Sequence, residues 1–374
     1  GNGRCNVTHR PILKEAYHGS EVSFCHYALE KYGWVQVKDF FSLLGLDLIF
    51  DDQGRAYPYT LHSGSVLDCL RFAIEDAGVQ TLTSTEVKYI EKKSTCFELK
   101  TDKMDIYLAD AVVLATGGAC APQTGSNGGG YVLAESLGHK TTEICPGIVQ
   151  IKTENSFTKK LAGLRFDVQA DIYIGKDRIR SEKGELLFTD YGVSGPVALQ
   201  LSGVVSRYLH LDKKRSSDLT IKIDFLPDIP RDEVLGIIQK RIDIFPERTV
   251  DKLFAGLFVN RLSIALIRYA SAISMSERIN QLDVKWVENI AQVIKSVSIP
   301  VRGVRGLNEA QVTIGGINTS AFSPRTMESN FQPGFYAIGE VLDIDGDCGG
   351  YNLQWAWSSA LIAADAICAN RKSS

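Results

Sequence analysis

Carboxylates and glycines near the end of the sequence form the pattern best suited to binding a cofactor. Glu340 and Asp343 follow a short apolar run that is typical of a buried strand, and carboxylates in this position can bind sugar hydroxyls. Gly349 and Gly350 come next, before a helix that we expect to open near Asn352. Glycine lets a ligand approach the backbone, and a helix N-terminus carries positive partial charge. The stretch therefore predicts a site for an anionic cofactor.

The elements that must position these residues are predicted from the hydrophobic pattern. A helix is expected over 65–77, where apolar residues recur at helical spacing and Gly78 provides the stop. Short strands follow at 85–90, 97–101, 104–108 and 111–115. A helix and a β-meander that lead into Ala115-Thr116-Gly117-Gly118 are typical of a mononucleotide-binding half-fold. Taken alone, Thr116–Gly118 is either a ligand contact or an ordinary turn after a strand.

The usual dinucleotide fingerprint is missing, because no strand leads into G-x-G-x-x-G and a helix. The sequence opens instead with the glycine-rich segment 1–8, which is either a plain turn or a cofactor-side loop.

Several motifs of different types nevertheless occur in one order along essentially the whole chain. They are Gly3-Arg4-Cys5-Asn6-Val7-Thr8, Leu114-Ala115-Thr116-Gly117-Gly118, 184–195, 311–316, Thr326-Met327-Glu328-Ser329 and the terminal motif. In this order they resemble the bacterial aminoacetone oxidase-like family of NAD(P)/FAD-dependent oxidoreductases. The resemblance implies a discontinuous Rossmann-like FAD-binding domain with an inserted β-domain and a small helical domain, an α/β and α+β architecture.

The resemblance also implies which residues contact the cofactor. It places the start of the last helix at the flavin pyrimidine edge, Asp343 near the ribityl chain, and the backbone of Val87 at the adenine, although plain sheet pairing explains Val87 equally well. It assigns no catalytic residue. The implied FAD-binding residues are Asn2, Gly3, Arg4, Cys5, Asn6, Thr8, Val87, Thr116, Gly117, Gly118, Gly339, Glu340, Asp343, Gly349, Gly350, Tyr351, Asn352 and Leu353.

In that family a strand, a G-x-G-x-x-G turn, a helix and a second strand precede the first loop. This sequence lacks the unit, which grips the FAD pyrophosphate and the adenosine ribose. We therefore expect an N-terminally truncated chain whose cofactor cleft is empty.

Composition indicates a soluble globular protein of two or three domains, with 374 residues, 44% hydrophobic and 23% charged. A formal net charge of −3 argues against a nucleic-acid partner. Eight cysteines without C-x-x-C spacing favour a reducing, cytoplasmic location, and neither they nor the six histidines form a metal motif. No apolar run is long enough to span a membrane.

Changes in hydrophobic period divide the chain into three expected domains. Residues 1–143 and 308–374 are assigned to the FAD-binding domain, 144–229 and 296–307 to the β-rich inserted domain, and 230–295 to the helical domain. The resemblance implies a loop of the β-rich domain made of Phe188-Thr189-Asp190-Tyr191 and Ser194-Gly195-Pro196, although a plain turn would look the same. Residues 253–270 are expected as a helix.

The function predicted from these features is that of an FAD-dependent oxidoreductase. The resemblance implies hydride transfer through flavin N5 to or from a small organic substrate, with NAD(P)H as a possible electron donor. Reduction of an activated C=C bond and amine oxidation both remain open. The same features also leave room for a cofactor-free fragment with no activity of its own, and for an RNA-modifying flavoprotein. The sequence does not predict an oligomeric state.

Overall fold

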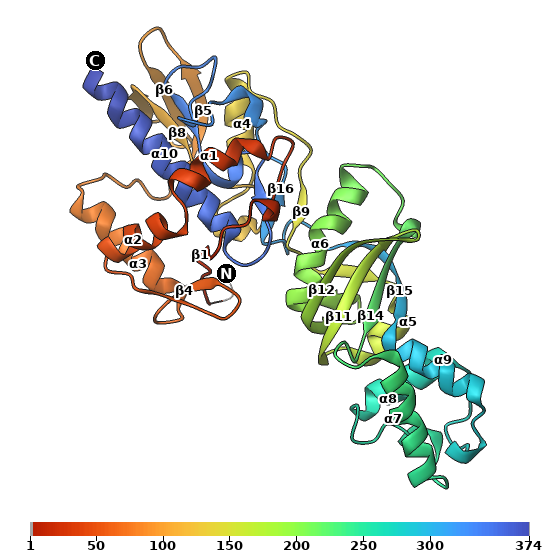
Figure 1. The fold of residues 1–374 in the computed structure, drawn as a ribbon. Coiled ribbons are helices and arrows are strands. Elements are labelled where there is room, and N and C mark those ends of the chain that lie inside the picture. The colour runs from red at the N-terminus through yellow and green to blue at the C-terminus, as the bar shows by residue number, and fades with distance from the viewer. Residues whose placement is uncertain (1–2, 374) are drawn as a thin grey trace. The chain divides into compact units, whose positions relative to one another are not determined.

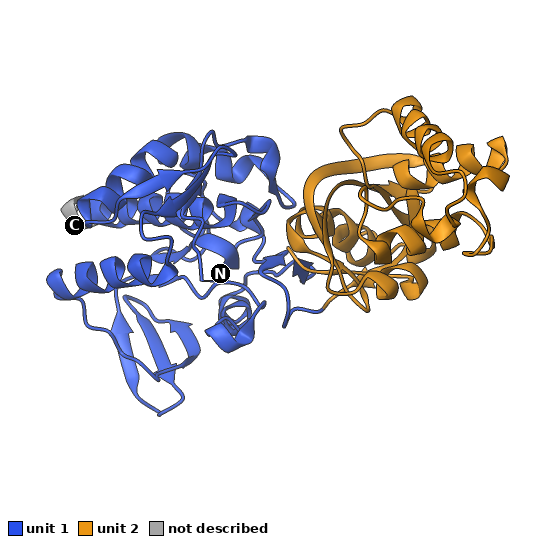
Figure 2. Cartoon of the chain, turned by 90° about the horizontal axis from the view of Figure 1, so that it is seen from below, with its two compact units in different colours: residues 1–147, 306–374 blue, residues 148–305 orange. Residues whose placement is uncertain are grey.

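The computed structural model describes residues 3–373, and the chain divides into two compact units (Figure 2). The first unit is made of residues 1–147 and 306–374, and the second of residues 148–305. Residues 230–295, which the sequence predicts as a separate helical domain, belong to the second unit together with the β-rich segment. The finer division into three domains stays a prediction.

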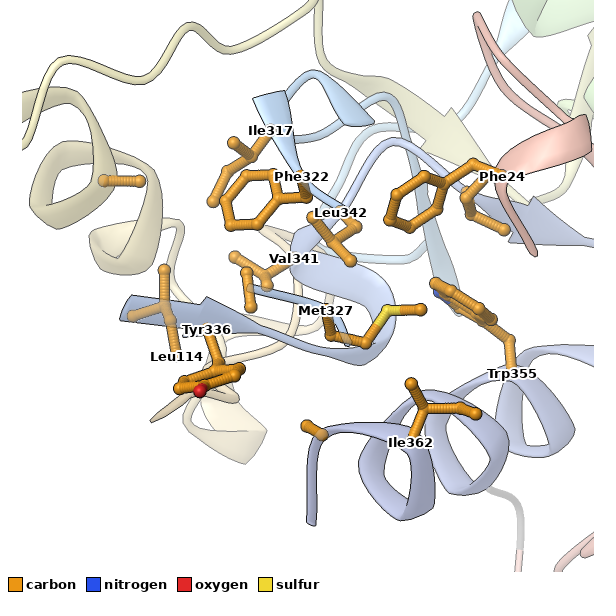
Figure 3. Close-up of a cluster of buried hydrophobic side chains, with 14 of the residues drawn as sticks. Phe24, Leu114, Ile317, Phe322, Met327, Tyr336, Val341, Leu342, Trp355 and Ile362 are labelled. Carbon is orange, nitrogen blue, oxygen red and sulfur yellow. The ribbon is translucent and has the colours of Figure 1, made fainter. Parts of the chain in front are cut away.

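The centre of the first unit is a pair of parallel strands, β8 (Val112–Leu114) and β17 (Phe335–Ala337) (Figure 1). Both were predicted from short apolar runs, and Phe335, Tyr336 and Ala337 are all buried. The long helix α10 (Tyr351–Ser373) contributes Trp355 to the same hydrophobic core. Figure 3 shows this core, in which the side chains of β17 and α10 lie with those of the loop between them. The core therefore fixes the strand ends relative to the start of α10.

Smaller sheets complete the first unit. The predicted β-meander is confirmed as an antiparallel sheet in which β6 lies between β5 and β7. The predicted helix is also confirmed and begins two residues earlier, where the side chain of His62 accepts a hydrogen bond from Gly64 N. The bounds are β1 (Thr8–His9), β2 (Tyr17–His18), α1 (Ser23–Lys31), α2 (Trp34–Leu43), β3 (Leu48–Phe50), β4 (Arg55–Pro58), α3 (Ser63–Asp76), β5 (Val87–Lys92), β6 (Phe97–Thr101), β7 (Ile106–Ala109), α4 (Gly129–Ser136), β9 (Cys145–Gly147), β16 (Val312–Ile314) and β18 (Asp345–Gly346).

The second unit is built on a closed barrel in the strand order β10-β13-β12-β11-β14-β15. Alternate residues of β11, namely Val168, Ala170 and Ile172, are fully buried, as expected for strands with one face toward a core. The bounds are β10 (Ile151–Thr153), α5 (Asn155–Thr158), β11 (Arg165–Ile174), β12 (Asp177–Phe188), β13 (Gly192–Ser194), α6 (Gly195–His210), β14 (Leu219–Asp224), α7 (Arg231–Ile244), α8 (Asn260–Ala270), α9 (Val284–Lys295) and β15 (Val297–Val304).

Two predictions in this unit were wrong. Ser194-Gly195-Pro196 is no loop but the start of α6, because proline suits the first turn of a helix and apolar residues recur behind it at helical spacing. The predicted helix over 253–270 begins only at Asn260. Residues 253–258 form turns instead, with Leu257 N donating to Phe254 O at 2.9 Å. None of the helices within residues 3–373 is long and apolar enough to cross a membrane.

Candidate functional site

The carboxyl ends of β8 and β17 meet at one edge of the parallel pair, as expected for parallel strands, and bring Gly118 and Glu340 together. A Cβ atom on Gly118 would lie 2.1 Å from Thr313 Oγ1 and 2.8 Å from Glu340 Oε1. Only glycine fits there. The backbone N–H of Thr313 donates to Glu340 Oε1 at 2.6 Å. Two motifs more than two hundred residues apart in the sequence therefore form one structure.

Burial and hydrogen bonding set the electrostatics around Glu340. Burial raises the pKa of Glu340, and the hydrogen bonds from Thr313 oppose that rise. The Cys120 thiol donates to Glu340 Oε1 over 3.5 Å. Burial is the main cause that raises the pKa of Cys120 to about 12, and the negative charge of Glu340 is the second. Cys120 is therefore a protonated thiol at neutral pH and can donate a hydrogen bond, but it is no thiolate nucleophile.

A pocket of about 440 Å³ opens beside Thr116 in the first unit. It contains two of the predicted residues, Val87 and Thr116. Its wall also includes the first residues of α4, where Gly129 N donates to Asn127 Oδ1 at 2.9 Å. A helix start in the wall gives the pocket backbone amides and a positive partial charge. The lining residues are Thr85, Glu86, Val87, Thr116, Gly125, Asn127, Gly129, Gly130 and Leu133.

The α4 start was not among the predicted site residues. Its signal is present in the sequence as Gly125-Ser126-Asn127-Gly128-Gly129-Gly130, a glycine-rich segment directly before a helix. The segment is tied to the predicted motif, because Ser126 Oγ donates to Thr116 O at 3.0 Å. The pocket and the Gly118–Glu340 junction therefore flank the same short loop, 116–118.

The first loop and the last motif meet at the start of α10. A Cβ atom on Gly350 would lie 2.5 Å from Thr8 O, and Gly350 has a φ of 109° that other residues rarely adopt. Thr8 Oγ1 donates to Gln354 Oε1. The bond from Gln354 N to Gly350 O, at 2.9 Å, belongs to the first turn of α10. The backbone N–H groups of Tyr351, Asn352 and Leu353 precede Gln354 in the chain, and at these first helix positions an N–H group has no acceptor within the helix.

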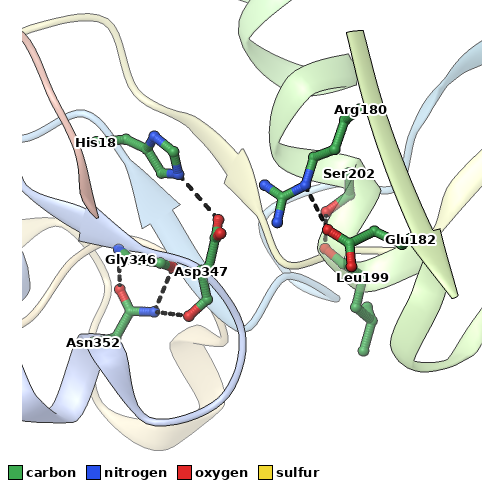
Figure 4. A network of polar contacts seen from close by, with 8 residues as sticks. All are labelled: His18, Arg180, Glu182, Leu199, Ser202, Gly346, Asp347 and Asn352. Carbon is green, nitrogen blue, oxygen red and sulfur yellow. Dashed lines mark hydrogen bonds and ion pairs between the residues drawn. The ribbon is translucent and has the colours of Figure 1, made fainter. Parts of the chain in front are cut away.

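Asn352 and Tyr351 hold the backbone around this helix start. Asn352 Oδ1 accepts from Gly346 N at 2.8 Å, and Asn352 Nδ2 donates to Gly346 O at 2.7 Å (Figure 4). The Tyr351 ring stacks on His9 with 4.6 Å between ring centroids, and its hydroxyl lies 3.2 Å from His9 Nδ1. Burial raises the pKa of Tyr351 to about 12. Both side chains are therefore structural supports of the site.

Two histidines for which the sequence predicted no role lie next to this motif. His9 stacks on Tyr351, and His18 Nε2 lies 3.0 Å from Asp347 Oδ1 (Figure 4). No sequence signal pointed to them, because both partners are more than three hundred residues away along the chain.

Asp343 is buried, and its carboxylate is already bonded within the protein. Asp343 Oδ2 accepts from Ser20 Oγ at 2.6 Å and from Ser20 N at 3.2 Å. The Asp343 carboxylate, which the resemblance places beside the ribityl chain of the cofactor, therefore already accepts two hydrogen bonds from Ser20. Gly339 is likewise buried, and Ser359 Oγ accepts from its N–H at 2.9 Å.

The first loop contains a buried acceptor with an unmet hydrogen bond. Asn6 Oδ1 is buried and has no hydrogen-bond partner among the residues that the structure describes. Gly3 and Arg4 are exposed, whereas burial raises the pKa of the half-buried Cys5 thiol. Asn2 lies outside the described residues. A ligand with a donor group would satisfy Asn6.

These features fit an anionic, hydroxyl-rich cofactor such as FAD. Two glycine-fronted helix starts can bind phosphate or a ring that gains negative charge, and Glu340 and Asn6 offer acceptors to hydroxyl groups. Within residues 3–373, no group of three or more His, Cys, Asp or Glu side chains could hold a metal ion.

The amino-acid sequence of residues 1–366 matches the model of the HI0933-like protein Rossmann domain. The chain belongs to the HI0933-like family. This family consists of FAD-binding oxidoreductases, so the predicted oxidoreductase class and the Rossmann-like α/β fold are confirmed.

Named relatives differ in what they act on. A 3-dehydro-bile acid delta(4,6)-reductase of Clostridium scindens is 31% identical over 98% of this chain and 88% of its own length. Ribosomal RNA dihydrouridine synthases of Escherichia coli and Haemophilus influenzae are each 28% identical, over 100% and 98% of this chain and 89% and 88% of their own lengths. The structure of Diels-Alderase PyrE3 covers 96% of this chain and 59% of its own at 11% identity, but with a TM-score of only 0.31.

Proposed function

We propose that this protein is a cytoplasmic FAD-dependent reductase that acts on an activated C=C bond of a small organic substrate, with NAD(P)H as electron donor. The observation that carries FAD binding is the pocket beside Thr116, into which Val87 and the start of α4 also face. The choice of a reductase over an amine oxidase of the aminoacetone oxidase type is supported by the bile acid reductase relative.

Different residues of the chain would bind different parts of FAD. The first amides of α4 and α10 would bind anionic parts of FAD, and Glu340 and Asn6 would accept bonds from its hydroxyl groups. When bound, FAD supplies hydride transfer. Gly118 and Gly350 keep the backbone close enough for these contacts, because a side chain at either position would collide with its neighbour.

FAD binding is tested by adding excess FAD to the purified chain, desalting, and recording the visible absorbance. Retained flavin bands are expected. Their absence would contradict the proposal and would support the alternative predicted from the sequence, a cofactor-free fragment with an empty cleft and no activity of its own.

The type of reaction, reduction of a C=C bond or oxidation of an amine, is tested by anaerobic titration of the FAD-loaded chain with NADPH and, separately, with a primary amine. We expect NADPH to bleach the flavin absorbance, and a 3-oxo-4,6-diene steroid acid to restore it. Bleaching by the amine alone would identify an amine oxidase instead.

An RNA substrate is the second candidate. It is supported by two relatives that are named as ribosomal RNA dihydrouridine synthases.

A further inference from the structure

The two units carry net charges of opposite sign, which the formal net charge of −3 for the whole chain does not show. Residues 148–305 contain 25 Lys and Arg against 19 Asp and Glu, whereas residues 1–147 and 306–374 contain 16 against 25. The net charge of the whole chain therefore says little about either unit. It does not argue against a nucleic-acid partner for the second unit.

Most of the positive surplus comes from two short segments of the second unit. Residues 173–180 and 207–222 together hold eight Lys and Arg but only three Asp and Glu. The first segment is the hairpin tip between β11 and β12, and the second leads from α6 into β14. Outside them, basic and acidic residues of this unit are almost balanced.

The fold brings these two segments together at one end of the barrel. Gly175 N at the hairpin tip donates to Asp218 O at 2.8 Å. Tyr173 on β11 pairs in register with Thr220 on β14. The hairpin tip and the start of β14 are therefore adjacent, although they lie apart in the sequence, and both segments end at the same end of the barrel. We call this region, residues 173–180 and 207–222, the basic barrel end.

The side chains of the basic barrel end are suited to a phosphate backbone. Lys176, Arg178, Lys214 and Arg215 are exposed. Of the three acidic residues of this region, Asp218 accepts a hydrogen bond from Tyr208 Oη at 3.0 Å, whereas Asp177 and Asp212 are exposed among the more numerous cations. Arg180 pairs with Glu182 at 2.7 Å (Figure 4).

An aromatic ring lies among these cations. Lys222 Nζ lies 3.9 Å from the centroid of the Tyr173 ring, on the outer face of the barrel. Mixed cations and aromatic rings are typical of surfaces that bind nucleic-acid backbones and bases. A lipid surface would call for more apolar anchors than the two exposed ones here, Ile179 and Leu211.

We propose that the basic barrel end is a binding surface for the phosphate backbone of a nucleic acid. The proposal concerns binding alone and does not depend on the redox chemistry proposed above. Its failure would leave the reductase proposal intact.

The test is fluorescence anisotropy of a short fluorescein-labelled RNA hairpin with the full chain at about 50 mM and about 200 mM salt. The test variant combines Lys176→Glu, Lys214→Glu and Arg215→Glu. The control variant combines Lys240→Glu, Lys252→Glu and Lys285→Glu, which are exposed in the same unit and change the net charge equally. Circular dichroism verifies that both variants fold.

We expect the test variant to bind RNA at least about tenfold more weakly, with a shallower dependence on salt, and the control variant to bind like the unaltered chain. A DNA duplex of the same sequence shows whether the 2′-hydroxyl contributes, and binding of either nucleic acid supports the proposal. Equal weakening in both variants, no binding at the lower salt, or binding only to phosphatidylserine vesicles would overturn it.

Discussion

His139 is a buried histidine whose imidazole is surrounded by aromatic rings. Its ring stacks on Phe322 and lies tilted against Phe331, each at 4.5 Å between centroids. Neither ring nitrogen has a partner among the described residues, and the residue is 4% exposed. Burial lowers the pKa of His139 from 6.5 to about 4. The folded protein therefore holds the neutral ring.

The free energy of unfolding should depend on this residue below neutral pH. The unfolded chain takes up a proton at pH 6.5, whereas the folded chain does so only near 4. The contribution of the neutral His139 ring to the free energy of unfolding is therefore fully present above pH 6.5. As the pH falls toward 4, the free energy of unfolding decreases by up to about 3 kcal/mol because of this residue.

Urea unfolding of the unaltered chain and of His139→Leu between pH 7 and pH 4 checks this expectation. The variant should show a flatter pH dependence whatever its absolute stability. His210→Gln, at an exposed position, should keep the original slope. Parallel slopes in all three proteins would refute the assignment.

Gly350 is a residue at which a single added methyl group should disturb both the first loop and the start of α10. Gly350→Ala places a Cβ 2.5 Å from Thr8 O at a positive φ, so we expect a loss of about 2 kcal/mol in the free energy of unfolding and weaker FAD binding. Denaturant unfolding and FAD titration measure the two effects.

The control for this change is Gly236→Ala inside α7, where nothing lies within 4 Å of the new Cβ. It should stabilise the chain by roughly 0.5–1 kcal/mol, because alanine loses less backbone entropy than glycine. An unaltered stability of Gly350→Ala would mean that the loop and the helix start are not in close contact.

At the scale of elements, the start of α10 depends on the turn before it. Asn352 bonds both the N–H and the carbonyl of Gly346, and its neighbour Tyr351 packs on His9. Asn352→Ala leaves these backbone groups without their partner, and we expect a cost of about 2 kcal/mol together with weaker FAD binding.

Thermal unfolding and flavin fluorescence measure those two quantities. Asn289→Ala removes one exposed bond, from Asn289 Nδ2 to Ala270 O, and should change stability by less than about 0.5 kcal/mol. If Asn352→Ala behaves like this control, the turn is held by packing alone.

At the scale of the whole molecule, the second unit has the features of an independent folding domain. Its barrel is closed, and its entry and exit strands pair, with Lys152 opposite Gly303 and Arg305 N donating to Gln150 O at 2.9 Å. The chain therefore enters and leaves the unit at neighbouring points, as is usual for inserted domains.

We expect residues 148–305 to fold cooperatively when expressed alone and to keep the RNA affinity of the full chain. Urea unfolding and the same anisotropy measurement check both points. A molten or insoluble product would show that the barrel needs the first unit.

Local patterns predicted the elements of the site but not all of their partners. Apolar runs identified β8 and β17, glycines identified the start of α10, and both follow from periodicity over a few residues. The helix α6 was missed because Gly195-Pro196 is typical of a turn as well as of a helix start.

The sequence alone was sufficient for the family motifs, for the two apolar runs that form β8 and β17, and for the glycines that precede α10. Tertiary structure decided that Thr8 meets Gly350, that Thr313 bonds Glu340, and that His18 pairs with Asp347. It also gathered the positive charge of two separate segments at one end of the barrel. The physical reason is that propensity and spacing act over a few residues, whereas these contacts join residues that only the packing of the core brings together.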